Sequence, residues 1–199
     1  MPIDMPAAPG FVRSSFGLEA HTQTFTSPLT RNTQRLVLTG GRWRADYTLP
    51  KMNARQAGPW MAFLDQCEGM ANTFNAYDPD RQRPLGAGTG TPLVKNASQT
   101  GSSLTTDGWT NSTLVLKAGD YFSVNGELKR VIADVTSDGS GNATVTFKPA
   151  LRSSPADNAP LTLTKPTCTM ILESDQQGFW ECDHNGIYQE KTFSAYEVF

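Results

Sequence analysis

Histidine and cysteine are scarce in this sequence, which has two histidines and three cysteines among 199 residues. The cysteines, Cys67, Cys168 and Cys182, form an odd set without a CxxC pair, so they do not indicate a disulfide framework and fit a reducing cytoplasm. The paired close spacings of structural zinc sites are also missing. We therefore expect no metal, although Cys168, Cys182 and His184 could converge with Cys67 or His21 on one zinc ion.

Long apolar runs and an excess of one charge are also absent. No run approaches the roughly 18 residues that a membrane span needs, and the opening MPIDMPAAPGF has neither the basic start nor the apolar stretch of a secretion signal. Seventeen basic side chains balance 19 acidic ones without a Lys or Arg run. We expect a soluble, unsecreted protein without membrane insertion, and nucleic acid is not an obvious partner.

Catalytic motifs are missing as well. Cys182, Asp183 and His184 are adjacent, but on a strand only Cys182 and His184 could share a side. The chain has no GxSxG elbow, and its GAGTGT stretch lacks the Lys-Ser/Thr of a phosphate-binding loop. The carboxylates are scattered through turn-like segments, where they usually cap and solvate. The sequence therefore predicts no enzyme activity and no cofactor.

What the sequence does contain is a strand pattern followed by a helix pattern. In residues 42–49 the side chains of Trp43, Ala45, Tyr47 and Leu49 alternate with polar ones, which predicts a strand that lines a core. After Pro50, Asn53 can cap a helix over about 53–69 with Gln56 in the capping-box position. Because Pro59 spoils the first turns of that helix, a start at Pro59 is the alternative.

Most of the remaining chain shows strand and turn signals. Residues 21–41, HTQTFTSPLTRNTQRLVLTGG, predict two strands and a turn. ANTFNAYDP predicts another strand, and the Gly/Pro-rich RQRPLGAGTGTPL after it is interpreted as a linker. Further on, Asn125-Gly126 lies between two strand-like runs and is a strong hairpin signal. The tail has a turn at 184–186, and its weakly alternating 188–195 suits an edge or interface strand.

Taken together, these segments predict a mainly β protein with a single helix and no convergent polar cluster. Such a pattern is typical of binding and assembly proteins, whose function lies in their surfaces.

The order of the segments resembles that of distal tail proteins from long-tailed bacteriophages. The similarity is carried by LTRNTQRLVLTGGRWRADYTLPKMNARQAGPWMAFLDQCEGMANTFNAYDPDRQRPLG, then by AGDYFSVNGELKRVIADVTSDGSGNATVTFKPALRSSP, and then by the final TFSAYEV. It extends from about Gly17 to the end of the sequence. Its specific elements are the Gly-x-Trp strand, the helix with Trp60, the Tyr-Asp-Pro and the hairpin that begins at Gly119-Asp120. None of them is a catalytic motif.

The resemblance implies a fold and an assembly. The fold would be a β-sandwich or barrel with one packed helix, formed by 1–88 and 166–199, with 92–165 as a small inserted β-barrel-like domain. The protein would form a homohexameric ring in the virion tail tip after synthesis in the host cytoplasm. Its partners would be its own copies, the tail tube protein and the baseplate hub protein, with the tape measure protein as a further candidate. Genomic DNA would only pass through the lumen.

Two sets of residues are candidates for surface function. Arg42, Arg44 and Asp46 lie on the polar face of the predicted strand, where they would meet the next subunit or the lumen. The alternative function is a monomeric module that binds a host-surface glycan through the inserted domain. In that case the aromatic rings of Trp109, Tyr121 and Phe122 would stack on sugar.

Overall fold

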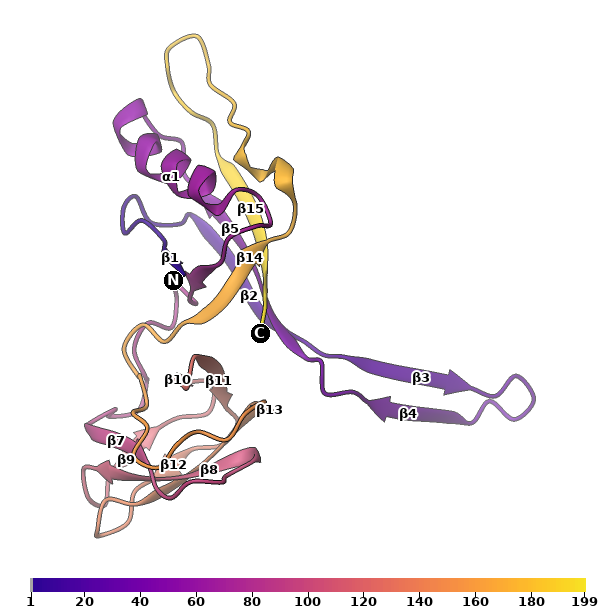
Figure 1. The fold of residues 1–199 in the computed structure, drawn as a ribbon, viewed down its shortest axis with the longest axis vertical. Coiled ribbons are helices and arrows are strands. Elements are labelled where there is room, and N and C mark those ends of the chain that lie inside the picture. Colours follow the sequence, from indigo (N-terminus) through magenta and orange to yellow (C-terminus); the bar gives the residue numbers. More distant parts are fainter. Residues whose placement is uncertain (1) are drawn as a thin grey trace.

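The computed structural model describes residues 2–199 and shows a mainly β protein with a long protruding arm (Figure 1). The body of the molecule holds a six-stranded sheet with a helix packed on it and a curled five-stranded sheet below. The predicted fold class, mainly β with one packed helix and a second small β unit, is confirmed.

The six-stranded sheet joins four strands from residues 3–76 with two strands from residues 168–197. β1 and β6 pair in parallel, whereas the other neighbours are antiparallel. Across the sheet the order is β1 (Ile3–Asp4), β6 (Phe74–Ala76), β14 (Cys168–Leu172), β15 (Lys191–Glu197), β5 (Arg42–Leu49) and β2 (Arg13–Glu19). The longest pairings place β5 between β15 and β2, so β5 is an inner strand buried on one face.

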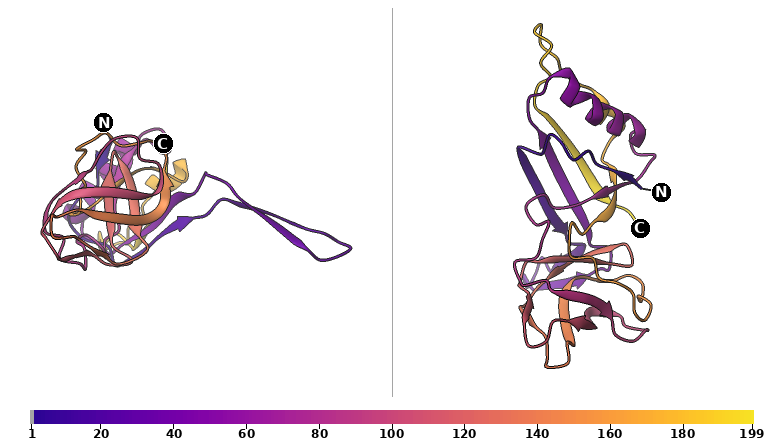
Figure 2. Two further views of the ribbon diagram at one scale, coloured as in Figure 1. Left: turned by 90° about the horizontal axis from the view of Figure 1, so that it is seen from below. Right: turned by 90° about the vertical axis from the view of Figure 1, so that its left-hand side faces the viewer.

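Helix α1 (Ala54–Cys67) covers the apolar face of this sheet (Figure 2). Asn53 accepts a hydrogen bond from the Gln56 N–H, and the Gln56 side chain accepts one from the Asn53 N–H. The predicted capping box is thus confirmed, and the alternative start at Pro59 is wrong because the helix runs through that proline. The helix ends at Cys67, where the following Glu68 adopts the left-handed conformation.

The core between α1 and the sheet is formed by alternate residues of the strand β5 and by residues at helical spacing in α1, as the sequence predicts. Trp43, Ala45, Tyr47 and Leu49 are fully buried, as the alternation in β5 predicts. From the helix side the buried residues are Ala57, Trp60, Phe63, Leu64 and Cys67. Trp60 and Phe63 meet edge to face, which is a favoured arrangement of aromatic rings.

The second sheet is curled and small. Its order is β10 (Tyr121–Val124), β11 (Glu127–Val131), β13 (Ala143–Leu151), β8 (Gly101–Trp109) and β7 (Gly90–Val94), and a short pair, β9 (Leu114–Leu116) with β12 (Val135–Thr136), lies beside it. Asn125 and Gly126, both with positive φ, form the tight turn between β10 and β11, as predicted. The predicted linker is shorter than expected, because its last residues begin β7 at Gly90.

The two sheets pack directly against each other. Tyr121 and Leu128 of the second sheet belong to the core of the first, and the indole N–H of Trp43 donates to the carbonyl of Leu128 at 2.9 Å. A separate core, centred on Phe122 and Phe147, fills the curled sheet. The two cores therefore meet at Tyr121 and Leu128. The domain boundaries implied by the resemblance, 1–88 with 166–199 and 92–165, stay a prediction.

The expectation of an edge strand at 188–195 is wrong. β15 lies inside the six-stranded sheet, between β14 and β5. Its alternation is weak because Thr192 and Ser194 form side-chain hydrogen bonds to Thr48 and Asp46 of the neighbouring strand, which makes small polar residues suitable for an inner position. Within residues 2–199, no helix has the length and apolar character needed to cross a membrane.

Candidate functional site

The most unusual surface of the molecule is the arm, a two-stranded hairpin of β3 (Thr22–Thr26) and β4 (Thr33–Val37) that leaves the body (Figure 1). The predicted pair of strands and turn is confirmed here. At the tip, Ser27 donates its N–H to the Asn32 carbonyl and Arg31 donates to the Ser27 carbonyl, both at 2.9 Å. The Thr-rich strands favour extended backbone, and Thr26 and Thr33 are joined by their hydroxyls.

Every residue of the two arm strands is exposed. The register puts Phe25 and Leu36 on one face with Gln23 and Gln34, and these residues line a shallow hollow. Phe25 is 65% exposed and Leu36 57%, while Leu29 at the tip is 93% exposed. An isolated two-stranded hairpin is marginally stable in water, so an arm with bare apolar side chains is a surface that suits a partner.

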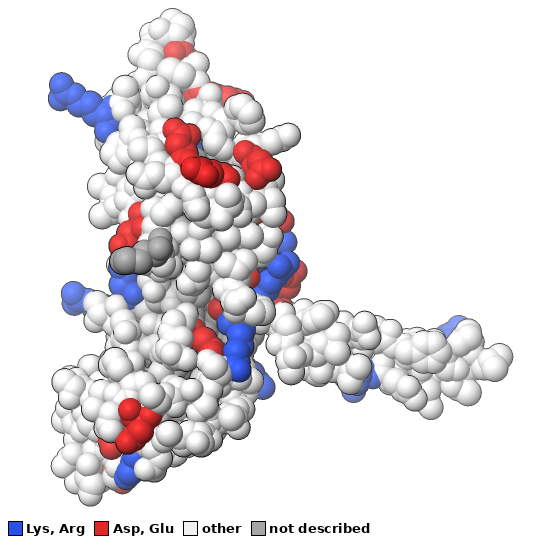
Figure 3. All heavy atoms as spheres, in the orientation of Figure 1, with Lys and Arg blue, Asp and Glu red and all other residues white. Residues whose placement is uncertain are grey.

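The arm carries charge of one sign. From Thr22 to Val37 its charged residues are Arg31 and Arg35, with no Asp or Glu, although the whole chain has a net charge of −2. Figure 3 shows the arm as a mostly uncharged projection with isolated basic side chains, next to a body that carries both signs. The body is therefore more acidic than the arm.

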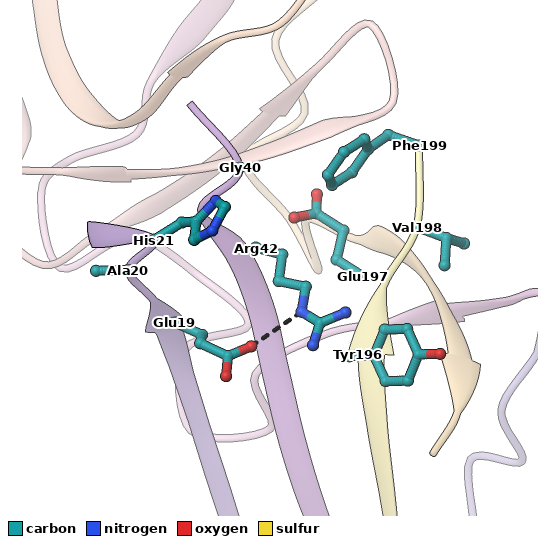
Figure 4. A pocket seen from close by; sticks show the side chains of 9 residues that line it. All are labelled: Glu19, Ala20, His21, Gly40, Arg42, Tyr196, Glu197, Val198 and Phe199. Carbon is teal, nitrogen blue, oxygen red and sulfur yellow. Dashed lines mark hydrogen bonds and ion pairs between the residues drawn. The ribbon is translucent and has the colours of Figure 1, made fainter. Parts of the chain in front are cut away.

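A groove of about 550 Å³ opens at the base of the arm (Figure 4). It is lined by the ends of β2, β5 and β15 and by the segments that lead into and out of the arm: Glu19, Ala20, His21, Gly40, Arg42, Tyr196, Glu197, Val198 and Phe199. A side chain at Gly40 would come within 2.7 Å of Nδ1 of His21, so the exposed His21 ring would have to move to admit one. The lining also includes Val198, Phe199 and the ring of Tyr196, which lie apart from one another around the end of β15 (Figure 4).

Arg42, predicted as an interface residue, lies in this groove. Its Nε donates to Glu19 Oε2 at 2.9 Å, and its guanidinium carbon lies 4.3 Å from the centroid of the Tyr196 ring. The hydrogen bond and charge of Arg42 lower the pKa of Glu19. Arg42 is thereby held in a fixed position although its side chain is 38% exposed.

Arg44 and Asp46 follow on the same face of β5, away from α1. Arg44 Nη2 pairs with Glu173 Oε1 at 2.7 Å, and Asp46 accepts a hydrogen bond from the Ser194 hydroxyl. Together with Arg42 they form a row on the sheet face that the helix leaves open, in which both arginines are ion-paired and Asp46 is hydrogen-bonded to a neutral hydroxyl. Sequence reasoning found the row but not its partners, because Glu173 and Ser194 are more than a hundred residues away.

Arg152 links the groove to the second sheet. It donates to both carboxylate oxygens of Glu197 and to the Gly41 carbonyl at 3.2 Å, and its guanidinium carbon lies 3.8 Å from the centroid of the Phe199 ring. Sequence reasoning missed Arg152, Glu197 and Phe199. Their local sequences carry no signal for this contact, since the interaction depends on how the two sheets pack.

The aromatic residues considered for sugar stacking are buried. Tyr121 packs in the core of the six-stranded sheet and Phe122 in the core of the curled sheet. Trp109 is also buried, and its indole N–H donates to Thr106 Oγ1 at 2.7 Å. In this structure none of the three offers an open ring face to a ligand.

The cysteines and histidines are dispersed. Cys67 and Cys168 are buried, which raises the pKa of both thiols, to about 11 for Cys67, whereas Cys182 is exposed. Among the residues that the structure describes, no group of three or more His, Cys, Asp or Glu side chains is placed to hold a metal ion.

Comparison with known proteins adds no assignment. No protein-family model matches the chain, and no curated protein matches it at a significant level.

Proposed function

We propose that the protein is a structural subunit of a bacteriophage tail tip, where copies of it form a ring that joins the tail tube to the baseplate hub. The observation that carries this proposal is the arm, whose two strands expose all of their residues. The resemblance of the segment order to distal tail proteins supplies the identity of the assembly and the number of six copies. The arm supplies the physical reason for assembly.

The arm gives a reason for assembly because its two strands do not pack against the rest of their own chain. Burying Phe25, Leu29 and Leu36 requires another chain, and each large apolar side chain that is fully buried contributes about 1.5–3 kcal/mol. A stable interface uses about 20–30 residues from each partner, which is more than the arm strands alone provide. The body next to the arm must therefore take part in the same contact.

The contact made by the arm is directional. If the arm of one subunit docks on a different part of the next, and that subunit does not return the contact to the first, repeated contacts run head to tail and close into a ring when the rotation between subunits allows it. The open sheet face with Arg42, Arg44 and Asp46 suits either a subunit contact or the lumen. Its arginines are neutralised by Glu19 and Glu173, and a wall without excess positive charge would let DNA pass.

In this proposal the protein acts without catalysis or a cofactor, in the tail tip of the virion. Its partners are other copies of itself, the tail tube protein and the baseplate hub protein, with the tape measure protein as a further candidate. The glycan-binding alternative has less support, because Trp109, Tyr121 and Phe122 are all buried.

The test is the mass of the purified protein in solution. Light scattering at several concentrations, with electron micrographs of the same fractions, should show a ring with a central hole. A variant in which Gly-Gly replaces residues 22–37 should keep the β-rich circular dichroism spectrum and lose the ring. A ring whose subunit contacts are weak closes more readily when another protein holds the subunits together. The same measurement is therefore repeated with the tube and hub proteins present. An intact protein that stays monomeric in both conditions contradicts the proposal.

A further inference from the structure

The arm continues the pairing of β2 and β5, but with a break in register. The ladder between β2 and β5 ends at the pair of Glu19 and Arg42. Two residues, 20–21, separate β2 from β3, whereas four residues, 38–41, separate β4 from β5. Such an unequal count interrupts the pairing and bends the strands. The arm accordingly turns away from the direction of the sheet at this point (Figure 1).

The two connections, residues 20–21 and 38–41, together form a joint. No residue of the joint is buried, so no packed core holds it. Outside the strand ladders, a single backbone hydrogen bond within residues 2–199 crosses the joint, from the Leu38 N–H to the His21 carbonyl at 2.8 Å. The longer connection ends in two glycines, which adds backbone freedom. The joint by itself therefore restrains the arm only weakly.

Arg152 reaches the joint from the second sheet. Its Nη2 donates to the Gly41 carbonyl at 3.2 Å. The same guanidinium is paired with Glu197, whose carboxylate accepts the N–H of Trp43 at 3.1 Å. The two side chains thus hold the backbone on both sides of Arg42, the first residue of β5 after the joint. The position of the chain where it enters the sheet is therefore fixed by this pair.

Arg152 is itself fixed to the second sheet. Its backbone N–H donates to the Glu127 carboxylate of β11 at 3.1 Å. The Arg152 side chain is 20% exposed and that of Glu197 only 2%, so water competes little for the hydrogen bonds between them. The ion pair next to the joint, Arg42 with Glu19, gives weaker support, because both of its side chains are more than a third exposed.

We propose that the Arg152–Glu197 pair is a latch through which the second sheet sets the direction of the arm, and that the arm swings at the joint when the latch is open. The inference goes beyond the proposed assembly, since it concerns a single chain and holds with or without a ring. The alternative is a joint that is stiff through its own backbone. In that case the arm would keep its direction without Arg152.

The test measures the distance between the arm and the body in single molecules. Donor and acceptor dyes are attached to the thiols introduced by Gln34→Cys on the arm and Arg55→Cys on α1, both at exposed positions, in a Cys182→Ser background that removes the exposed thiol. Energy transfer is recorded at picomolar concentration, so that each chain is observed alone. With the latch intact, we expect one narrow distribution of distances.

Arg152→Lys opens the latch and keeps a cation beside buried Glu197. Lysine lacks the fork of donors with which arginine contacts Glu197 and the Gly41 carbonyl together. Molecules outside the wild-type distance range should become about fivefold more frequent, as the loss of one hydrogen bond implies. Arg44→Lys is the matched control, because Arg44 pairs with Glu173 further along β5, and it should leave the distribution unchanged.

Circular dichroism checks that each variant is folded. If Arg152→Lys does not fold, Glu197→Gln takes its place, because it removes the anion that holds the guanidinium while the guanidinium keeps some contact with water. Equal distributions in the wild type and the latch variant would overturn the inference, since two narrow ones indicate a stiff joint and two broad ones a latch without effect. An equal broadening in Arg44→Lys would overturn it as well. None of these outcomes alters the mass measurement that tests the ring.

Discussion

The guanidinium of Arg152 donates two hydrogen bonds to the carboxylate of Glu197, at 2.9 and 2.6 Å, and thereby joins the end of β13 to the end of β15. Glu197 is almost completely buried and also accepts the backbone N–H of Trp43 at 3.1 Å. The pair therefore lies at the junction of the two sheets and at the base of the arm.

Removing Arg152 should destabilise the protein strongly, because Glu197 would remain buried without its cationic partner. We expect Arg152→Ala to lower the free energy of unfolding by about 3–5 kcal/mol, measured by urea denaturation. Arg83→Ala is the control, since Arg83 is exposed and forms no ion pair among the described residues. Its effect should stay within about 0.5 kcal/mol. Equal stability of the two variants would contradict the structural role of the Arg152–Glu197 pair.

Stability should also fall in acid through Glu127. Burial raises the pKa of Glu127, but hydrogen bonds from Lys129 Nζ and from the N–H groups of Arg152 and Ser153 outweigh it, so the pKa lies below its usual value of 4.5. The stabilisation is thus fully present above pH 4.5 and is lost as the pH falls through the lowered pKa. Urea denaturation between about pH 7 and about pH 3 should show this decline.

The decline should be smaller in Glu127→Gln, which has no carboxylate to protonate. That variant should also be less stable at neutral pH, because buried Lys129 loses its anionic partner. Glu190→Gln, at an exposed position, is the matched control and should keep the wild-type pH dependence. A Glu127→Gln profile parallel to that of the wild type would show that the acid sensitivity arises elsewhere.

The helix cap gives a third prediction. Asn53→Ala removes the acceptor for the Gln56 N–H and should lower the free energy of unfolding by about 1 kcal/mol. Asn53→Asp keeps an acceptor at the N-cap and places a negative charge at the helix N-terminus, so its stability should stay close to that of the wild type. Thermal unfolding followed by circular dichroism measures both variants, and an Asn53→Asp loss as large as that of Asn53→Ala would argue against the cap.

Thiol reactivity should divide the three cysteines. At about pH 8 an aromatic disulfide reagent should modify one thiol quickly, that of exposed Cys182, and the other two only after denaturation. Burial protects Cys67 and Cys168 and raises their pKa values, which keeps the reactive thiolate rare. Cys182→Ser should abolish the fast reaction, and a remaining fast thiol would show that one of the buried sites opens.

Much of the local structure could be predicted from periodicity and turn chemistry. The alternation in 42–49 predicted which side chains of β5 are buried, Asn53 and Gln56 predicted the cap, and Asn125-Gly126 predicted a tight turn. These signals are local, because a side chain's direction on a strand or helix depends on its neighbours within a few residues.

The candidate site was predicted only in part. Arg42 was identified from its place on the polar face of a strand, but Phe199 and Arg152 were not, because their contact depends on sheet packing. The arm left a signal that could have been used: TQTFT and TQRLV carry few apolar side chains on either face, which is unusual for a strand that packs on its own core. Tyr121 and Phe122 were candidates for sugar stacking only under the alternative function, and adjacency in sequence does not reveal that each side of β10 meets a different core.

The sequence by itself determined the mainly β class, the single helix with its cap and the position of the hairpin turns, since these depend on short-range patterns. Only the tertiary structure decided that β15 is an inner strand, that Arg152 reaches Glu197, and that the hairpin of β3 and β4 projects from the body. Those features depend on contacts between residues far apart in the chain, and a strand pattern is the same whether its partner lies in the same molecule or in the next.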